Sequence, residues 1–403
     1  MPIEEIEGGT ITTPQGFSAG AAYAGIKKAG EGVLDVALLV SEAPCRAAAL
    51  FTTNRIKAAP VLVSRKHLNG NLPGAVAVNS GCANACTGKQ GLKDAREITG
   101  IVADGLSMRP EDVLIASTGV IGVLLPMEKI REAMDSIVLS YDGGHRFAHA
   151  IMTTDTFPKE IALSVKSGGV SFTIAGACKG AGMIHPDLAT MLCFLTTDAA
   201  VEPKFLQSAL KKAAGDTLNM VSVDNDCSTN DTVFLLANGM AGNDEIGPRS
   251  PLAGVFQEAL DQICVYLAKA IARDGEGATK LMEVRVKGAG SIADARRAAR
   301  CIADSSLVKA AVHGNDPNWG RIVCALGCSG ARIRESRIEL SMNGTVLMKN
   351  GEPQPFDAAL ESRRMDVPEV DILLDLHLGK GEAVAWGCDL SEEYVTINSD
   401  YTT

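Results

Sequence analysis

The chain has 403 residues, of which 46% are hydrophobic, enough to bury the cores of two or three domain-sized units. Its formal net charge of -10 argues against a surface for nucleic acid or for an anionic membrane, since both need clustered Lys and Arg. The first residues are acidic where a targeting peptide is basic, and no apolar run reaches the ~18 residues that a membrane span needs. We therefore expect a cytoplasmic protein that acts on small molecules.

Eleven cysteines are spread through the chain, an odd number that fits reduced thiols better than a disulfide framework. Cys82 with Cys86 and Cys324 with Cys328 have a spacing that would place both thiols on one helix face, as in some zinc sites. Both segments resemble loops of small residues. We expect no structural metal.

Apolar runs and amphipathic stretches alternate along the first three quarters of the chain, which predicts alternating strands and helices. The expected strands cover residues 33–40, 75–78, 113–117, 170–175, 190–195, 233–237 and 282–287. The expected helices cover residues 91–105, 126–140, 203–220, 251–273 and 291–305. This order predicts an α/β fold in which helices layer the sheets.

The pattern changes near residue 332. Strands are expected over 332–342 and 370–376, with Asn-Gly turn signals between them and a helix near 356–364. These elements predict a smaller C-terminal α+β layer over about 332–403. No repeat or flexible linker separates it from the rest, so we expect the units to pack together.

One glycine-rich motif, GAGSIA at 288–293, follows an expected strand and opens an expected helix, as a dinucleotide-binding loop does. No acidic residue stands about 20 residues later to bind a ribose. We interpret the motif as a tight turn whose helix is capped by Ser291.

The segment KGAGMIHPDLATMLCFL at 179–195 carries the main chemical hypothesis. It places Thr190 after a small residue, between a proline-containing loop and an apolar strand. A Thr hydroxyl needs an adjacent base, and cleavage of the bond before it would release an α-amine for that purpose. On local spacing alone, an ordinary β-branched strand residue is the simpler interpretation.

This segment resembles the self-cleavage motif of the ornithine acetyltransferase family, the glutamate N-acetyltransferases of arginine biosynthesis. Cys82, His185 and Leu188 depart from the family pattern, where Asn, a small residue and Met are expected, and none of them alters Thr190. Further matching stretches follow in one order: FTTN at 51–54, NSG at 79–81, STGVIG at 117–122, MTTDT at 152–156, DGEGATK at 274–280, DPNWGR at 316–321 and INSDYTT at 397–403.

The resemblance implies a self-processing N-terminal-threonine acyltransferase with a DmpA/ornithine acetyltransferase-like fold. It implies a cut between Ala189 and Thr190, giving an alpha subunit of residues 1–189 and a beta subunit of residues 190–403 that assemble as a heterotetramer. Thr190 would take the acetyl group of N-acetylornithine and pass it to glutamate by a ping-pong mechanism, with no tightly bound cofactor and no metal. Acetyl-CoA stays open as a second acetyl donor, because the sequence has no legible motif for it.

Matching positions also assign the rest of the site. Thr118 and Gly119 correspond to the family's oxyanion hole, which stabilises the tetrahedral intermediate. Lys179 and Glu276 suit the carboxylate and the ammonium group of the substrate. The substrate-binding positions expected from the match are Thr156, Lys179, Thr190, Glu276, Asn398 and Thr403.

Two alternatives remain at the level of sequence. An N-terminal-nucleophile aminopeptidase or amidase would hydrolyse the same acyl-enzyme with water and would release acetate without glutamate. A non-enzymatic small-molecule binding protein would keep an uncut chain, which denaturing electrophoresis distinguishes at once.

Overall fold

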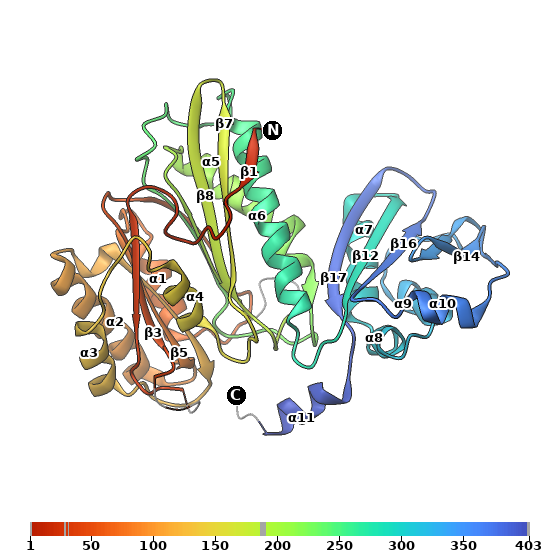
Figure 1. The fold of residues 1–403 in the computed structure, drawn as a ribbon, viewed down its shortest axis with the longest axis horizontal. Coiled ribbons are helices and arrows are strands. Elements are labelled where there is room, and N and C mark those ends of the chain that lie inside the picture. The colour runs from red at the N-terminus through yellow and green to blue at the C-terminus, as the bar shows by residue number, and fades with distance from the viewer. Residues whose placement is uncertain (1, 28–29, 31, 186–190, 401–403) are drawn as a thin grey trace.

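The computed structural model describes residues 2–27, 30, 32–185 and 191–400. It consists of two bodies, a larger one built on two sheets and a smaller one built on a third sheet (Figure 1). Four positions named above, Leu188, Ala189, Thr190 and Thr403, lie outside the described residues.

A four-stranded sheet forms one half of the larger body. Its strands are apolar over most of their length, because helices cover one face and the second sheet covers the other. Strands β5 and β6 run parallel, so both end at the same edge. The strands, in sheet order, are β2 (Phe17–Ala22), β3 (Val36–Ser41), β5 (Ala75–Cys82) and β6 (Val113–Val120), and the covering helices are α1 (Ala59–His67), α2 (Gly88–Leu106) and α3 (Met127–Asp135).

A six-stranded sheet packs face to face with the first one through a shared apolar layer that includes Leu39, Phe194 and Phe234, with α4 (Gly144–Ile151) at the same layer. Its other face is covered by α5 (Pro203–Asp216) and α6 (Ala253–Arg273). The larger body is thus a four-layer sandwich of helices, two sheets and helices. The strands, in sheet order, are β1 (Ile3–Glu5), β7 (Lys159–Ser167), β8 (Val170–Lys179), β9 (Leu192–Thr197), β11 (Thr232–Ala237) and β4 (Arg46–Phe51).

The smaller body is a seven-stranded sheet whose core is continuous with the α5 and α6 layer of the larger body. Its short edge strand β10 lies between α5 and β11 in the sequence, so the chain of the larger body also contributes to this sheet. The strands, in sheet order, are β10 (Val221–Ser222), β17 (Gly381–Cys388), β12 (Leu281–Ala289), β16 (Glu369–Asp375), β13 (Glu339–Met342), β14 (Thr345–Lys349) and β15 (Glu352–Pro353). Its helices are α7 (Ile292–Asp304), α8 (Ser306–His313), α9 (Trp319–Cys328) and α10 (Ala358–Arg364).

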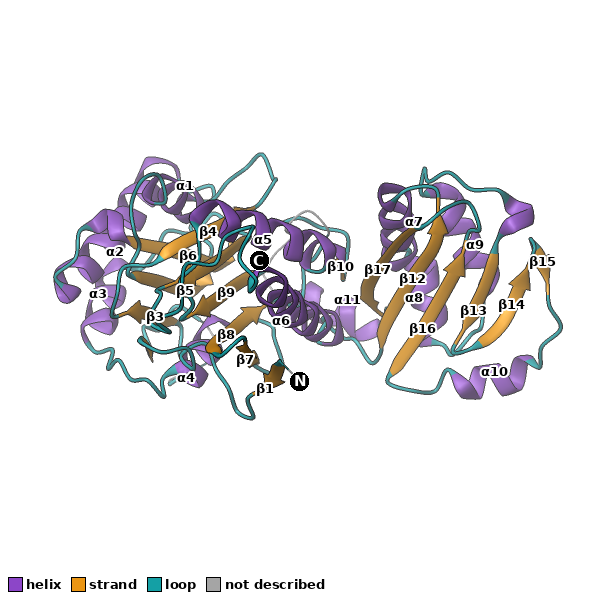
Figure 2. Ribbon diagram, turned by 90° about the horizontal axis from the view of Figure 1, so that it is seen from above, coloured by secondary structure: helices purple, strands orange, loops and turns teal. Residues whose placement is uncertain are grey.

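The last helix, α11 (Glu392–Asp400), leaves the smaller body after β17 and lies between the two bodies (Figures 1 and 2). None of its side chains is buried. It is held instead by polar contacts, among them the Ser391 hydroxyl, which donates to the Gly277 carbonyl at 2.5 Å just before the helix starts. Gly277 lies in the connection between α6 and β12, so this contact holds the start of α11 at the junction of the two bodies.

The structure confirms the layered α/β fold and corrects several expected boundaries. The C-terminal layer does not begin near residue 332, because β12, starting at Leu281, lies inside the same sheet between β17 and β16. The expected strand 332–342 begins only at Glu339, after a 3₁₀ turn. The expected helix 126–140 ends at Asp135, since Ser140 pairs with Ala19 at the edge of β2.

Three local interpretations also had definite outcomes. Ser291 caps α7 as expected, its hydroxyl accepting from the Asp294 amide at 3.1 Å. Cys324 and Cys328 are exposed and lie in α9 rather than in a loop. Within the described part of the chain, no helix has the length and apolar character to cross a membrane.

Candidate active site

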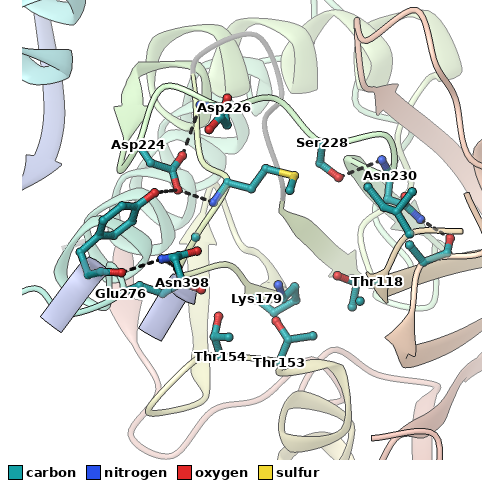
Figure 3. Close-up of a pocket in the computed structure, with 16 residues that line it drawn as sticks. Thr118, Thr153, Thr154, Lys179, Asp224, Asp226, Ser228, Asn230, Glu276 and Asn398 are labelled. Atoms are coloured by element: carbon teal, nitrogen blue, oxygen red, sulfur yellow. Dashed lines mark hydrogen bonds between the residues drawn. The ribbon is translucent and has the colours of Figure 1, made fainter. Parts of the chain in front are cut away.

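A cavity of about 200 Å³ opens where elements of both bodies meet. The strand order explains its position: β9 and β11 are parallel and start at the same edge, and antiparallel β8 ends there, with Lys179 opposite Leu192. In Figure 3, Asp224, Glu276 and Asn398 gather on one side of the cavity, Thr118 lies on the other, and Lys179 lies between them. The lining includes Thr118, Gly119, Thr153, Thr154, Lys179, Gly182, Met183, Asp224, Asp226, Ser228, Asn230, Glu276, Tyr394 and Asn398.

The wall at Thr118 and Gly119 is the end of β6, packed closely against the end of β5. Gly119 has φ +126°, and a Cβ there would meet the carbonyl carbon of Gly81 at 2.3 Å, so only glycine fits. The Ser117 hydroxyl donates to Asn79 Oδ1 at 2.6 Å, and the Asn230 amide donates to the Ser117 carbonyl at 2.7 Å. This segment is fixed from two sides, which suits groups that must be preorganised to bind an oxyanion.

Lys179 belongs to a buried network of charges at the floor of the cavity. Its side chain is 3% exposed, and its Nζ lies 3.9 Å from Asp155 Oδ2. Lys159, fully buried below it, donates to Asp155 Oδ1 at 2.7 Å and to Asp274 Oδ2 at 2.5 Å. Burial lowers the pKa of Lys179, although the Asp155 carboxylate acts in the opposite direction.

Asp155 is the centre of this network. It also accepts the backbone N–H groups of Thr153 at 2.9 Å and Gly180 at 2.7 Å. Burial acts to raise its pKa, but the ammonium groups of Lys179 and Lys159 hold that pKa well below the usual range. The floor therefore presents one ammonium group, that of Lys179, to the cavity.

Thr156, which we expected to bind substrate, is not among the described residues that line the cavity. Its side chain is exposed, and both its hydroxyl and its amide donate to Asp274. Thr153 and Thr154, from the same MTTDT stretch, are the ones among the described residues that line the cavity. The stretch turns after α4, so a shift of two or three residues moves a side chain from the cavity to the far side of the turn.

The opposite side of the cavity is acidic. Glu276 reaches it because Gly182 has no side chain: a Cβ at Gly182 would meet the Glu276 carboxylate at 2.3–2.4 Å. Asn398, on α11, donates to Glu276 Oε2 at 2.8 Å. Tyr394, one turn earlier, donates to Asp224 Oδ2 at 3.3 Å, so α11 covers this side through two polar contacts (Figure 3).

Asp224 anchors the segment that follows the glycine-rich stretch. It accepts the backbone N–H groups of Met183 at 2.6 Å and Ile184 at 2.9 Å. Burial raises the pKa of Asp224 above the usual range, although these hydrogen bonds act to lower it. The Asp224 carboxylate thus ties the segment after the glycine-rich stretch to the polar segment before β11.

Sequence reasoning missed this polar segment, SVDNDCSTND at 222–231. It supplies Asp224, Asp226, Ser228 and Asn230 to the cavity lining. The signal was available, because a dense polar run stands directly before an apolar strand. The polar run reaches the cavity because β11 lies parallel to β9, so that both strands start at the same edge. That pairing cannot be predicted from the sequence.

Two other motifs that match the family, DGEGATK and DPNWGR, make contacts that fix neighbouring elements. In DGEGATK, Asp274 accepts from the buried Lys159 ammonium and Glu276 lines the cavity. The amides of Thr279 and Lys280 donate to Asp389 at 2.8 Å and fix the end of β17. DPNWGR begins α9, where Asn318 Oδ1 caps the helix by accepting from the Arg321 amide at 3.3 Å. Among the residues that the structure describes, no group of three His, Cys, Asp or Glu side chains could hold a metal ion.

Comparison with known proteins gives a consistent result. A model of the ArgJ family matches residues 18–403. The arginine biosynthesis bifunctional protein ArgJ of Dehalococcoides mccartyi is 53% identical over 401 residues, covering 100% of this chain and 99% of the relative. The protein of the same name from Symbiobacterium thermophilum is 51% identical over 403 residues, with both chains covered at 100%.

A solved structure is similar to part of the chain. The crystal structure of arginine biosynthesis bifunctional protein ArgJ from Bacillus halodurans has 43% sequence identity and a TM-score of 0.50, covering 51% of this chain and 97% of that chain. Together with the match along nearly the whole length of two relatives, this settles the family. The chain belongs to the ArgJ family.

Proposed function

We propose that this protein is a cytoplasmic, self-cleaving acetyltransferase that moves the acetyl group of N-acetylornithine to glutamate in arginine biosynthesis. The observation that supports the proposal most directly is the convergence of Thr118, Lys179, Glu276 and Asn398 on one cavity. That cavity lies at the sheet edge where β9 begins, two residues after the proposed nucleophile in the sequence. The names of the ArgJ relatives agree with the pathway.

The proposed cut separates residues 1–189 from residues 190–403. The hydroxyl of Thr190 attacks the carbonyl carbon of Ala189, the peptide C–N bond breaks, and water hydrolyses the resulting ester. The two pieces stay associated because the strands on either side of the cut, β8 and β9, pair with each other along their length. The Bacillus halodurans chain, matched over 97% of its length by 51% of this chain, has about the size of one such piece.

In the transfer reaction, the released α-amine takes the proton of the Thr190 hydroxyl, and the hydroxyl oxygen attacks the acetyl carbon of N-acetylornithine. The tetrahedral oxyanion is stabilised by the Thr118 hydroxyl and the Gly119 N–H, and ornithine leaves with a proton on its nitrogen. The glutamate amine then attacks the acetyl ester and regenerates Thr190. The acetyl group is conserved in each cycle.

Charge complementarity accounts for the substrate. We propose that the Lys179 ammonium binds the α-carboxylate, and that Glu276, supported by Asn398, binds the side-chain ammonium of ornithine. Thr153 replaces Thr156 in this proposal, because Thr153 lines the cavity and Thr156 does not. Thr403 remains a proposed binding position by its match alone, and a heterotetramer of two alpha and two beta chains remains the proposed assembly.

The test uses purified protein. Denaturing electrophoresis is expected to give two bands, and Edman sequencing of the C-terminal fragment is expected to start at Thr190. Glutamate is then supplied with N-acetylornithine or with acetyl-CoA in separate reactions, and N-acetylglutamate is measured. Product from the first reaction supports the proposal, and product from the second identifies acetyl-CoA as an additional donor.

Two outcomes would contradict the proposal. A single uncut band that persists on storage would indicate a binding protein. Acetate release from N-acetylornithine at the same rate with and without glutamate would indicate an amidase.

A further inference from the structure

The acidic side of the cavity has to serve two substrates of opposite side-chain charge. In a ping-pong transfer, ornithine and glutamate bind by turns with the α-amine at the same nucleophile and the α-carboxylate at the same cation. Both are L-amino acids, so the chirality at Cα directs their side chains the same way. The side-chain nitrogen of ornithine and the side-chain oxygens of glutamate are the same number of bonds from Cα. An ammonium and a carboxylate therefore occupy the same part of the cavity in turn.

The carboxyl groups on this side suit the ammonium and not the carboxylate. Glu276, the proposed partner of the ornithine ammonium, lines the cavity together with Asp224 and Asp226 (Figure 3). A carboxylate placed among them is repelled unless O–H or N–H groups donate hydrogen bonds to it. Lys179 is assigned to the α-carboxylate that both substrates share. The side chain of glutamate therefore needs a separate hydrogen-bond donor on the acidic side.

Helix α11 brings two donors to this side, the Asn398 amide and the Tyr394 hydroxyl. The Asn398 amide nitrogen donates to Glu276 Oε2 at 2.8 Å and to the Tyr394 carbonyl at 3.0 Å, so both of its N–H groups are engaged. The Tyr394 hydroxyl donates to Asp224 Oδ2 at 3.3 Å, longer than the roughly 2.5–3.0 Å that is usual for such a bond. The Tyr394 hydroxyl is the donor that can be redirected at less cost.

Asp224 does not depend on this hydrogen bond. Its two carboxyl oxygens also accept the N–H groups of Met183 at 2.6 Å and Ile184 at 2.9 Å, so it keeps partners when the hydroxyl turns away. Tyr394 itself is half-buried on a helix that has no buried side chain, so packing does not lock the ring. Burial raises the pKa of the Tyr394 phenol, and the charge of Asp224 raises it further, so the hydroxyl keeps its proton and remains a donor.

We propose that Tyr394 determines specificity for the acceptor: its hydroxyl leaves Asp224 and donates a hydrogen bond to the side-chain carboxylate of glutamate. This inference rests on the proposed function and names the group that recognises its second substrate. Glu276 binds the charged end of ornithine, and Tyr394 binds the charged end of glutamate. Two adjacent side chains thereby allow one cavity to accept substrates of opposite charge.

The experiment compares the two half-reactions in Tyr394→Phe, which keeps the ring and removes the donor. In a ping-pong mechanism, kcat/KM for each substrate reports the half-reaction of that substrate alone. We expect kcat/KM for glutamate to fall about tenfold, because a hydrogen bond to a charged group is lost. We expect kcat/KM for N-acetylornithine to change by less than about twofold. Glu276→Gln is expected to show the opposite preference.

Isotope exchange provides an internal comparison within the same variant. Labelled ornithine enters N-acetylornithine through the acetyl-enzyme without any glutamate, so the exchange rate in Tyr394→Phe should equal that of the unmodified protein. Tyr266→Phe, at an exposed position of α6, is the matched control and is expected to change neither half-reaction nor the exchange.

Two results would overturn the proposal. An unchanged kcat/KM for glutamate in Tyr394→Phe would show that the hydroxyl does not contact the acceptor. Equal falls in glutamate acetylation and in ornithine exchange would show that Tyr394 supports the cavity wall without distinguishing the substrates.

The proposed function fails by a different result, the absence of both ornithine exchange and acetyl transfer in the unmodified protein.

Discussion

Two buried carboxyl groups, Asp155 and Asp231, both act on the charge of Lys179 but have opposite properties themselves. Asp155 has partners on both oxygens, including two backbone N–H groups and the Lys159 ammonium, and its pKa is held low. Asp231 has hydrogen bonds with the Met191 N–H and with the Thr52 side chain, but burial outweighs them and its pKa is raised. Burial is common to both, so the number and charge of the partners decide which group stays ionised.

The difference separates a fixed part of the cavity from a reactive part. The network of Asp155, Lys159 and Asp274 is made of buried ion pairs, and it holds Lys179 at the floor of the cavity. On the Asp231 side, where β9 and β11 begin, the carboxyl oxygen Oδ2 is buried and has no direct hydrogen bond to the described residues. The predictions below test this division, starting with the largest effect.

Thr190→Ala is expected to abolish both the cut and the acetyl transfer, because no other group replaces the nucleophile on the reactive side. Thr190→Ser retains a hydroxyl and is expected to keep a weakened version of both. Electrophoresis and the N-acetylornithine assay measure the two activities. Full activity in the Ala variant would show that Thr190 is not the nucleophile. The division of the cavity into a fixed part and a reactive part would then have no basis.

Asp155→Ala is expected to lower the free energy of unfolding by about 3–5 kcal/mol, because it leaves buried ammonium groups without their partner. Urea denaturation measures the change. Asp135→Ala, at the exposed end of α3, is the matched control and is expected to change stability by less than about 0.5 kcal/mol. A small effect at Asp155 would mean that the floor is not a fixed charge network.

The pH dependence of stability should differ in sign between the two carboxyl groups. The folded-state pKa of Asp155 is depressed, so its stabilising contribution is present above the unfolded pKa of about 3.9 and is lost as pH falls. The folded-state pKa of Asp231 is raised, so it penalises the folded chain increasingly as pH rises above about 3.9. Denaturation across pH should therefore show that Asp231→Asn gains stability relative to the unmodified protein as pH rises, whereas Asp155→Ala loses stability as pH rises. Changes of the same sign in both variants would refute the distinction.

Thr118→Val removes one proposed oxyanion donor while keeping the shape of the side chain. We expect kcat to fall by about 10²–10³ with little change in stability, because the donor acts mainly on the transition state. Thr118→Ser retains the hydroxyl and should lose less. Steady-state kinetics of acetyl transfer make the measurement, and an effect confined to KM would assign Thr118 to substrate binding instead.

Glu276→Gln is expected to have the smallest effect of these changes on the reaction. Loss of the carboxylate charge should raise KM for N-acetylornithine about tenfold, equivalent to about 1.4 kcal/mol, with kcat changed little. Glu245→Gln, at an exposed loop position, is the control. A fall in kcat with an unchanged KM would show that Glu276 belongs to the reactive side.

Much of the fold could be predicted from the sequence where local pattern is sufficient. The apolar runs of β3, β5 and β11 and the capping of α7 by Ser291 were all legible. The seven-stranded sheet was not, because β12 pairs with strands about 90 residues later in the chain. Pairing over such a distance leaves no mark in local periodicity.

The candidate site divides in the same way. Membership of the family follows from residue order alone. The hypotheses for Thr190, Lys179 and Glu276 also came from the sequence, through the motifs that carry these residues. The tertiary structure decided which side chains share the cavity, replacing Thr156 with Thr153 and adding Asp224 and Tyr394. It also decided that the pKa of Asp155 is lowered and that of Asp231 is raised, because each pKa depends on burial and on partners contributed by strands distant in the sequence.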